Sequence, residues 1–303
     1  MVDVCLLGTG GMMPLPERWL SSLLVRCNGR MMLIDCGEGT QIPMKMAGWG
    51  FKNLDAILIT HYHADHVAGL PGLLLTLANS GRQEPVRLIG PPGLAEVVSG
   101  LLTIAPGLPY PIYLYTCPAD GISHLEMDGL LIRCFPVDHW IPCLAYSIEL
   151  RRPGRFDAEK ARELDIPVRY WKQLQKGETV EWKGRSFRPD QVMGEPRRGI
   201  KICYCTDTRP VDGLCDFVRE ADLLVCEGMY GDEGDAEKAI LKKHMLFAEA
   251  ARVAREAGVC ELWLTHFSPA LACPEDWLSH AKEVFEPTIA GHDLMRKTLT
   301  FPS

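Results

Sequence analysis

The sequence predicts a layered α/β fold, and two observations support this class. Short apolar runs rich in β-branched residues recur along the whole chain with turn residues between them, as expected for buried strands. Helical stretches alternate with many of these runs, which is the pattern of helices packed on sheets. The chain has no internal repeat or low-complexity tract that would favour another class.

Eleven apolar runs are expected to form strands. They are Val2–Leu7, Ser22–Val25, Met31–Ile34, Ala56–Thr60, Val86–Ile89, Leu130–Val137, Ala145–Leu150, Ile200–Cys205, Leu223–Cys226, Leu262–Thr265 and Leu299–Phe301. The helices expected between them are Gly69–Asn79, Gly93–Leu102, Gly213–Glu220 and His244–Ala257. The last has the clearest signals, because its apolar residues recur at helical spacing and Gly258 follows as a stop.

Length and composition favour a globular protein with a sizeable core. The 303 residues are 47% hydrophobic and 23% charged, which suits one large domain or two ordinary ones. Twelve scattered cysteines, no signal-peptide pattern and no long apolar run favour a cytoplasmic protein without a membrane span. Cys203 and Cys205 lie within an apolar run and are expected to be core thiols.

The segment 151–199 departs from this pattern. It holds two helix candidates, Asp157–Asp165 and Tyr170–Lys176, among many Gly and Pro residues. From residue 151 to residue 201 there are 14 Lys/Arg against 8 Asp/Glu, a net charge of +6, whereas the rest of the chain carries −13. A basic block in an acidic protein indicates either a polyanion contact or a solvated face. We expect an arm inserted into a single domain spanning residues 1–303, with too little apolar surface for its own core.

Potential metal ligands follow the predicted strand Ala56–Thr60 directly. His61, His63, Asp65 and His66 place four such groups within six residues. Side chains alternate in an extended segment, so the first two histidines point the same way and can bind one ion. The other two residues then turn toward a second position. Imidazole and carboxylate groups suit Zn²⁺ and also accept Mn²⁺. The alternative is a histidine-rich surface loop, which the flanking strand and helix disfavour.

Three further predicted strands are followed by residues that could bind metal, namely His139, Asp207 and His266. Each is a weak signal alone, because a single histidine after a strand is more often structural. Parallel strands in α/β folds deliver side chains to one edge of the sheet. These residues are therefore stronger candidates for metal binding when they are considered together with the first cluster. Together they predict a two-metal hydrolytic site.

The ligand pattern resembles that of the metallo-β-lactamase fold, and nearly the whole chain is similar to the ribonuclease Z family of tRNA 3′-processing endonucleases. The motifs that carry the second resemblance are Leu7-Gly8-Thr9-Gly10, Ser21-Ser22, Asp35-Cys36-Gly37-Glu38-Gly39-Thr40-Gln41, Gly69-Leu70-Pro71-Gly72-Leu73, Asp207-Thr208-Arg209 and Lys176-Gly177-Glu178-Thr179-Val180. The resemblance implies an αββα sandwich that carries the basic segment as an inserted arm.

The resemblance also implies a metal-binding role for each candidate ligand. One zinc ion would be bound by His61, His63 and His139, and the other by Asp65, His66 and His266, with Asp207 bridging them. Each subunit would therefore hold two Zn²⁺ ions, with Mn²⁺ as the alternative.

Three residues are implied to take part in catalysis. Asp65 would orient the attacking water and take its proton, and His244 would act as general acid at the leaving oxygen. Glu227 would orient His244, for which a solvent-facing structural histidine is the alternative. His124 and two other histidines, at positions 280 and 292, match no ligand position and are expected to be structural.

In this family an inserted arm grips the tRNA elbow, and it lies between the same two ligand positions as residues 151–199 do here. Phosphate contacts made by such an arm depend on salt and read no sequence. The candidate contact residues are Arg151, Arg152, Arg155, Arg169 and Lys172. The resemblance further implies precursor tRNA as the partner and a homodimer, with the arm of one subunit serving the site of the other.

Several positions depart from the family pattern. The Gly-Pro element of the arm is missing, and Ile166-Pro167-Val168-Arg169-Tyr170 lies in its place. The family's His-Glu-Ala-Thr is Cys226-Glu227-Gly228-Met229, its His-Ser-Thr is His244-Met245-Leu246, and its Gly before the bridging aspartate is Thr206. No metal ligand is lost, so hydrolysis is expected, and the departures bear on the substrate instead.

The leading hypothesis is therefore a zinc-dependent endoribonuclease that cuts precursor tRNA after its 3′ end and leaves a 3′-hydroxyl. The alternative is a phosphodiesterase of the same fold that acts on cyclic nucleotides or other small diesters. A non-catalytic RNA-binding relative is disfavoured by the intact ligand set and His244. A lactamase is disfavoured because the basic arm would have no purpose.

Overall fold

The computed structural model describes residues 1–127 and 129–302. The chain forms two compact units. One comprises Met1–Glu149 and Lys201–Thr300, and the other comprises Leu150–Ile200 with the C-terminal residues from Phe301. Among the described residues, no helix has the length and hydropathy needed to cross a membrane.

The first unit contains two seven-stranded sheets, of which the first has the strand order β16-β1-β2-β3-β4-β5-β6. Its strands are β1 (Val2–Gly8), β2 (Ser22–Cys27), β3 (Arg30–Ile34), β4 (Leu54–Leu58), β5 (Val86–Gly90), β6 (Ile112–Thr116) and β16 (Met295–Leu299). Pairing is antiparallel from β16 to β3 and parallel from β3 to β6. Helices α1 (Gln41–Ala47), α3 (Leu70–Asn79) and α4 (Leu94–Leu102) bury their apolar residues in the same cluster as this sheet.

The second sheet has the order β15-β14-β13-β12-β9-β8-β7. Its strands are β7 (Ser123–Met127), β8 (Leu130–Val137), β9 (Cys143–Arg152), β12 (Arg197–Cys205), β13 (Leu223–Glu227), β14 (Leu262–Thr265) and β15 (Thr288–Ala290). Strands β12 to β15 are parallel. Helices α7 (Leu214–Val218), α9 (Phe247–Ala257) and α10 (Leu278–Lys282) share a buried cluster with this sheet.

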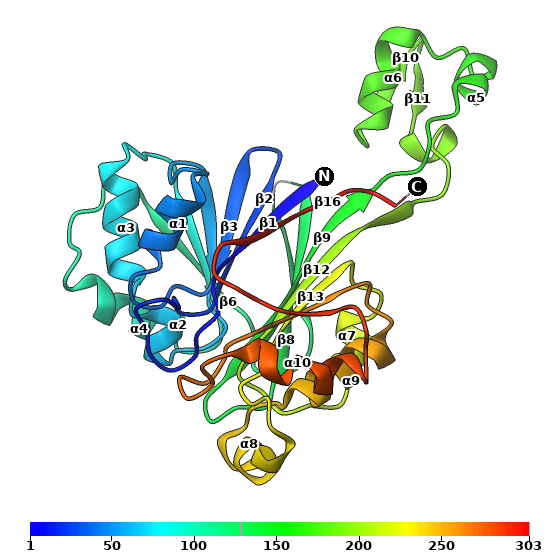
Figure 1. The fold of residues 1–303 in the computed structure, drawn as a ribbon. Coiled ribbons are helices and arrows are strands. Elements are labelled where there is room, and N and C mark those ends of the chain that lie inside the picture. The colour runs from blue at the N-terminus through cyan, green and yellow to red at the C-terminus, as the bar shows by residue number, and fades with distance from the viewer. Residues whose placement is uncertain (128, 303) are drawn as a thin grey trace. The chain divides into compact units, whose positions relative to one another are not determined.

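The two sheets lie between two layers of helices, so the expected αββα sandwich is confirmed. Figure 1 shows α1, α3 and α4 beside the first sheet and α7, α9 and α10 beside the second. Hydrogen bonds connect the sheets directly: the Tyr146 hydroxyl on β9 donates to the Ile59 carbonyl at 2.6 Å, and Leu144 N–H donates to the Thr60 carbonyl at 3.0 Å.

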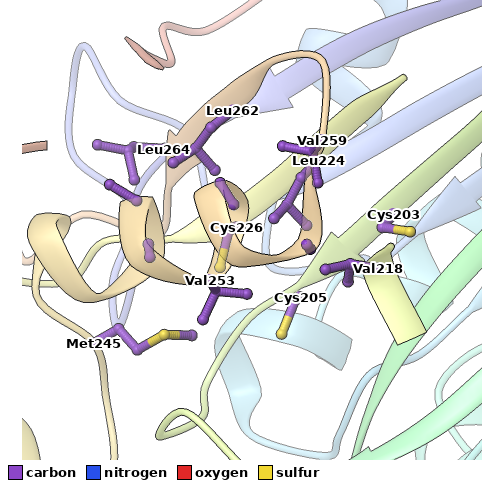
Figure 2. Close-up of a cluster of buried hydrophobic side chains, with 14 of the residues drawn as sticks. Cys203, Cys205, Val218, Leu224, Cys226, Met245, Val253, Val259, Leu262 and Leu264 are labelled. Carbon is purple, nitrogen blue, oxygen red and sulfur yellow. The ribbon is translucent and has the colours of Figure 1, made fainter. Parts of the chain in front are cut away.

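Helix α9 covers the second sheet closely because its buried face is made largely of alanines. Ala250, Ala251 and Ala254 are fully buried, and small side chains let a helix approach a sheet. Figure 2 shows Val253 of this helix in the same buried cluster as Cys205 and Cys226 of the sheet. Cys203 and Cys205 are both fully buried, which confirms that they are core thiols.

The second unit has a core of its own, so the expectation that it lacks one is wrong. It contains α5 (Ala158–Glu163), α6 (Val168–Gln175) and the hairpin of β10 (Val180–Trp182) and β11 (Arg185–Phe187). Six buried residues, among them Leu174 and Phe187, form the core, and partly buried residues such as Trp171 pack against it. These residues are dispersed among charged neighbours in the sequence, and they become one cluster only through the tertiary fold.

Several expected element boundaries are also wrong. The final strand is Met295–Leu299 instead of Leu299–Phe301, because its polar side chains alternate with half-buried ones and hide the strand signal. Helix α9 begins at Phe247 and not at His244. Strands β6, β7, β10, β11 and β15 and helices α1, α2 (Ala64–Val67), α8 (Ala236–Lys242) and α10 were not expected. They are short or partly exposed, and helix α1 contains Pro43.

Candidate metal centre

Four strands of the first unit end near one another, and the loops that follow them carry the predicted ligands. β4 precedes the segment from His61 to His66, β8 precedes His139, β12 precedes Asp207, and β14 precedes His266. The structure brings all seven predicted side chains together, although the segments lie far apart in the sequence.

The backbone turns sharply at these strand ends. Asp207 and His266 have φ values of 54° and 58°, and Asp35, which follows β3, has 62°. Left-handed conformations are uncommon for residues other than glycine and persist where the surrounding structure enforces them. This turn directs the side chains of Asp207 and His266 into the space between the strand ends.

The first group of donors is His61, His63 and His139. The Nδ1 atom of His63 lies 3.0 Å from His61 Nε2 and 3.2 Å from His139 Nε2. The Oδ1 atom of Asp207 lies 3.8 Å from His61 Nε2 and 3.9 Å from His139 Nε2. Three ring nitrogens and one carboxylate oxygen therefore face a common point.

The second group is Asp65, His66 and His266. The Nε2 atoms of the two histidines are 3.2 Å apart, and Asp65 Oδ2 lies 3.4 and 3.5 Å from them. The other oxygen of Asp207, Oδ2, lies 3.2 Å from His66 Nε2 and 3.3 Å from His266 Nε2. Asp207 thus presents one oxygen to each group, as a bridging ligand must.

The donor sets fit divalent cations. Nitrogens bound to one tetrahedral zinc ion at 2.0–2.1 Å would lie about 3.3 Å apart, close to the separations seen here. Asp207 Oδ2 is buried without a hydrogen-bond partner, which would be costly unless a cation sat beside it. Each of the two groups contains enough imidazole and carboxylate donors for Zn²⁺ or Mn²⁺.

Neighbouring side chains orient the ligands. Asp35 Oδ2 accepts a hydrogen bond from His66 Nδ1 at 2.8 Å, and the Thr60 hydroxyl lies 3.1 Å from His61 Nδ1. Carboxylate and hydroxyl partners of this kind determine which nitrogen of a ligating histidine faces the metal. Asp35 belongs to a motif identified in the sequence, but its contact with His66 could not be predicted because the two residues lie on different strand ends.

Met12 is a site residue that the sequence analysis missed. Its backbone N–H donates to Asp65 Oδ2 at 2.7 Å, and its φ of 68° is again left-handed. The preceding Gly11 is required by close packing, because a Cβ atom there would lie 2.8 Å from the His266 ring. The sequence signal for this loop is Gly10-Gly11 itself, although it indicates only a tight turn.

Opposite charges concentrate at the site. Burial would raise the pKa of Asp207, but the rings of His266 and His66 outweigh that effect and hold it well below its usual range. Burial would also raise the pKa of Asp65, but the charge on His66 outweighs burial and lowers that pKa. Both carboxyl groups are therefore ionised and suited to cation binding.

His244 lies beside the two donor groups and is paired with Glu227. Its Nδ1 is 3.1 Å from Glu227 Oε2 and 3.9 Å from Asp207 Oδ1. Burial lowers the pKa of His244, but Glu227 outweighs this and raises it to about 9. The pairing leaves Nε2 as the ring nitrogen that a substrate could meet.

A cavity of about 550 Å³ opens over the donors, lined among others by His63, Asp65, Asp207, His244 and His266. Trp140, Tyr230, Lys238 and Lys242 also line it. Cationic side chains in the wall of such a cavity suit a phosphorylated ligand.

The five cations predicted to bind substrate all belong to the second unit. Arg169 and Lys172 lie three residues apart on α6 and are exposed. Arg169 also stacks on the rings of Tyr170 and Trp182, at 4.8 and 4.7 Å from their centroids. Arg152 donates to the Pro302 carbonyl at 2.6 Å, whereas Arg151 and Arg155 are exposed.

The αββα sandwich and the paired histidine–aspartate donor groups define a metal-dependent hydrolase of the metallo-β-lactamase fold. Among related sequences, ribonuclease Z of Clostridium acetobutylicum is 53% identical and that of Clostridium kluyveri 52% identical, with 99% of both chains covered in each case. The chain therefore belongs to the ribonuclease Z family. A family model described as anti-Pycsar protein Apyc1 matches residues 2–102.

Solved structures agree with this fold. The crystal structure of human tRNase Z, short form, has a TM-score of 0.72 at 25% identity and covers 99% of this chain and 100% of its own. The metallo-β-lactamase fold protein YhfI of Bacillus subtilis has a TM-score of 0.69 at 20% identity and covers 98% of this chain, which supports the fold alone.

Proposed function

We propose that this protein is a two-zinc endoribonuclease that hydrolyses precursor tRNA just after its 3′ end and leaves a 3′-hydroxyl on the tRNA. The observation that carries the proposal is the convergence of two donor groups on the two oxygens of Asp207. Full-length similarity to proteins named ribonuclease Z supports the choice of substrate.

His61, His63 and His139 would hold one ion, Asp65, His66 and His266 the other, and Asp207 would bridge them. Two such ions lower the pKa of a water molecule and neutralise charge on the phosphoryl oxygens. Zinc is favoured because both groups are rich in imidazole and because neighbouring groups orient the rings.

The chain's own residues handle the protons. Asp65 is fixed by the Met12 N–H and faces the cavity, so it can orient the attacking water and accept its proton. As the new P–O bond forms, the bond from phosphorus to the tRNA O3′ breaks. His244, held by Glu227, donates a proton to that leaving oxygen. The products are a tRNA 3′-hydroxyl and a trailer with a 5′-phosphate.

The basic segment supplies affinity for the RNA backbone. Arg151, Arg152, Arg155, Arg169 and Lys172 would contact phosphates, and Arg169 and Lys172 present two of these charges on one face of α6. Contacts of this kind are independent of sequence and weaken steeply with salt, so they suit recognition of RNA by its shape.

The protein would act as a homodimer in the cytoplasm. All twelve cysteines are free thiols, which suits a reducing compartment. Exposed apolar residues on α1 and α3 offer a surface for a second copy.

The deciding experiment compares two substrates, a precursor tRNA with a 3′ trailer and bis(p-nitrophenyl) phosphate, after chelation and after addition of Zn²⁺ or Mn²⁺. Metal-dependent cutting at the base of the acceptor stem is expected. Turnover of the small diester without tRNA cleavage would instead favour the alternative, a phosphodiesterase for cyclic nucleotides or other small diesters. The absence of both activities at every metal concentration would contradict a two-metal hydrolase.

The role of the arm is tested by replacing its five candidate cations with glutamine. We expect KM for precursor tRNA to rise about 10- to 100-fold and its salt dependence to flatten, because phosphate contacts are lost. Turnover of the small diester should hardly change. A matched variant neutralises the exposed Arg252, Arg255 and Lys282 of the first unit and should retain tRNA cleavage. Equal losses on both substrates would contradict the proposed role.

A further inference from the structure

A second cavity, of about 350 Å³, opens beside the cavity that contains the metal ligands. The two share Tyr230, Lys238 and Ser268 in their walls, so they form one continuous depression in the first unit. The second cavity holds none of the predicted metal ligands, and Trp277 is among the residues that line it.

The walls of this second cavity are fixed by close packing. Trp277 lies against Gly231, where a Cβ atom would come within 2.4 Å of the tryptophan Cβ. His280 Nδ1 is 2.9 Å from the Gly231 carbonyl, and Ser268 N–H donates to the Met229 carbonyl at 3.2 Å. Any side chain at position 231 would displace the indole, so this glycine maintains the shape of the wall.

Arg18 fixes the loop that carries Leu271 and Ala272, two further residues of the lining. Its guanidinium donates to the Leu271 carbonyl at 2.8 Å and to the Ala272 carbonyl at 2.9 Å. Both carbonyls belong to the loop that follows His266, so the same loop carries a metal ligand and lines the second cavity. The cavity is therefore preformed and is held in a constant relation to the metal centre.

The lining of the cavity is unsuited to phosphate and suited to a nucleobase. Asp232, Asp235 and Asp276 place carboxylates around it, and these would repel a phosphate group. Carboxylates accept hydrogen bonds from the amino groups of bases, and aromatic rings such as Trp277 and Tyr230 stack on base faces. Of the residues that the structure describes, Lys238 is the one lysine in the lining of the second cavity and lies 3.6 Å from Asp235, so three carboxylates accompany a single cation there, whereas Lys242 lines the first cavity alone.

We propose that the second cavity binds the nucleobase next to the scissile phosphate, with Trp277 as its stacking surface. The proposal rests on the proposed function, because it requires an RNA substrate at the metal centre. The base belongs either to the last nucleotide of the tRNA or to the first nucleotide of the trailer. Both have the same chemistry, and the experiment distinguishes them.

The test is a double-mutant cycle between Trp277→Ala and an abasic nucleotide. Three precursor tRNAs are compared: an unmodified one, one abasic at the last tRNA nucleotide, and one abasic at the first trailer nucleotide. On the unmodified precursor, Trp277→Ala should lower kcat/KM by about 5- to 150-fold, the range expected for one stacked base. On the precursor that lacks the bound base, the same substitution should have no further effect.

Two controls keep the test decisive if Trp277→Ala perturbs folding. Trp49→Ala removes a tryptophan that lies in the first unit, outside both cavities, and its effect should be equal on all three precursors. Asp276→Ala changes an exposed side chain and should lower the preference for cytosine over uracil at the bound position, whereas Glu275→Ala should leave that preference unchanged.

The outcomes separate this inference from the proposed function. Suppose that the wild type cleaves precursor tRNA but Trp277→Ala lowers kcat/KM by the same factor on all three precursors. The proposed nucleobase site is then overturned, whereas the proposed nuclease function is not. An unchanged base preference in Asp276→Ala together with that result would remove any remaining support. If the wild type cuts no precursor at all, both proposals fall.

Discussion

Glu227 connects the proposed general acid to a ligand-bearing loop through three hydrogen bonds. One of its oxygens accepts from Thr208 N–H at 2.5 Å, and the other accepts from Met245 N–H at 2.9 Å and faces His244 Nδ1. The contact with Met245 uses only its main chain. This explains why the departure from the family's serine at position 245 is compatible with a correctly held His244.

His244→Ala should reveal whether this residue is the general acid. We expect kcat on precursor tRNA to fall about 10²- to 10⁴-fold, because the leaving alkoxide would lose its proton donor. Bis(p-nitrophenyl) phosphate should lose far less, because p-nitrophenolate leaves without protonation. Steady-state rates on both substrates, with metal content measured by mass spectrometry, check this. An equal loss on both substrates at full metal content would exclude the general-acid role.

Gly228 replaces the alanine of the family motif, and Phe247 explains why. A Cβ atom at position 228 would lie 2.8 Å from Phe247 Cδ1, closer than atoms normally approach. We expect Gly228→Ala to lower the free energy of unfolding by about 1–3 kcal/mol, the usual effect of overpacking a core. Urea unfolding monitored by tryptophan fluorescence measures this.

The contact between positions 228 and 247 can be tested directly, because a smaller side chain at position 247 should relieve the clash. Gly228→Ala combined with Phe247→Leu should recover most of the stability that Gly228→Ala loses, since contacting residues are not additive. Strict additivity of the two single substitutions would show that the two positions do not compensate each other.

Helix α9 begins three residues after His244 because polar groups near its first turn form hydrogen bonds with the backbone at its N-terminus. Glu249 accepts a hydrogen bond from Leu246 N–H at 2.9 Å, as the glutamate of a capping box does. Arg209 forms a two-pronged ion pair with Glu249 and donates to the His244 carbonyl at 2.5 Å. The start of the helix, the general acid and the loop after β12 are thereby connected.

Arg209→Ala should therefore affect both stability and turnover. We expect the free energy of unfolding to fall by about 2 kcal/mol, because Glu249 would lose its partner in a partly buried position. We expect kcat to fall roughly tenfold, because a shift of His244 misplaces the proton donor. Urea unfolding and precursor cleavage measure the two effects. Arg255→Ala, an exposed residue on the same helix, is the control and should change neither.

Elements with strong apolar runs could be predicted from the sequence, and weaker elements could not. β1, β8 and β14 were expected almost in full, since buried strands in this fold are nearly continuous hydrophobic runs. β6 was missed because most of its residues are exposed and it lies at the edge of a sheet. The hairpin of the second unit was missed because each of its strands has only three residues.

The candidate site was predictable in composition but not in its supporting contacts. Ligand residues follow strong strand signals, so their types and positions are evident in the sequence. The Met12 backbone contact and the His66–Asp35 pair depend on which loops meet in space, and local sequence does not encode this. For the same reason the second cavity, with Trp277 in its wall, left no signal in the sequence.

For the whole molecule, the proposed homodimer has a candidate surface on α1 and α3. Ile42 and Met46 of α1 are 46% and 57% exposed, and Leu75 of α3 is 38% exposed. The two helices touch, because a Cβ atom at Gly72 would lie 3.2 Å from Gln41. Exposed apolar residues on neighbouring helices are candidates for an interaction surface.

Substituting Met46 and Leu75 by glutamate should convert the dimer to a monomer, because charges would be buried without partners at the interface. Size-exclusion chromatography with light scattering measures the mass. Ile104→Glu is the matched control, because Ile104 is 74% exposed but lies outside this surface, and it should leave the mass unchanged. A dimer that survives the double substitution would place the interface elsewhere.

The pairing of β1 with β16 has a consequence during protein synthesis. Thr298 donates a hydrogen bond to Asp3, 295 residues earlier in the chain, so β1 pairs with a strand that is synthesised much later. A nascent chain can therefore complete neither its first sheet nor its second donor group until β16 and His266 have been synthesised. Pairing across such sequence separations slows folding. A nascent chain that lacks His266 would accordingly be unable to cut the RNA around it.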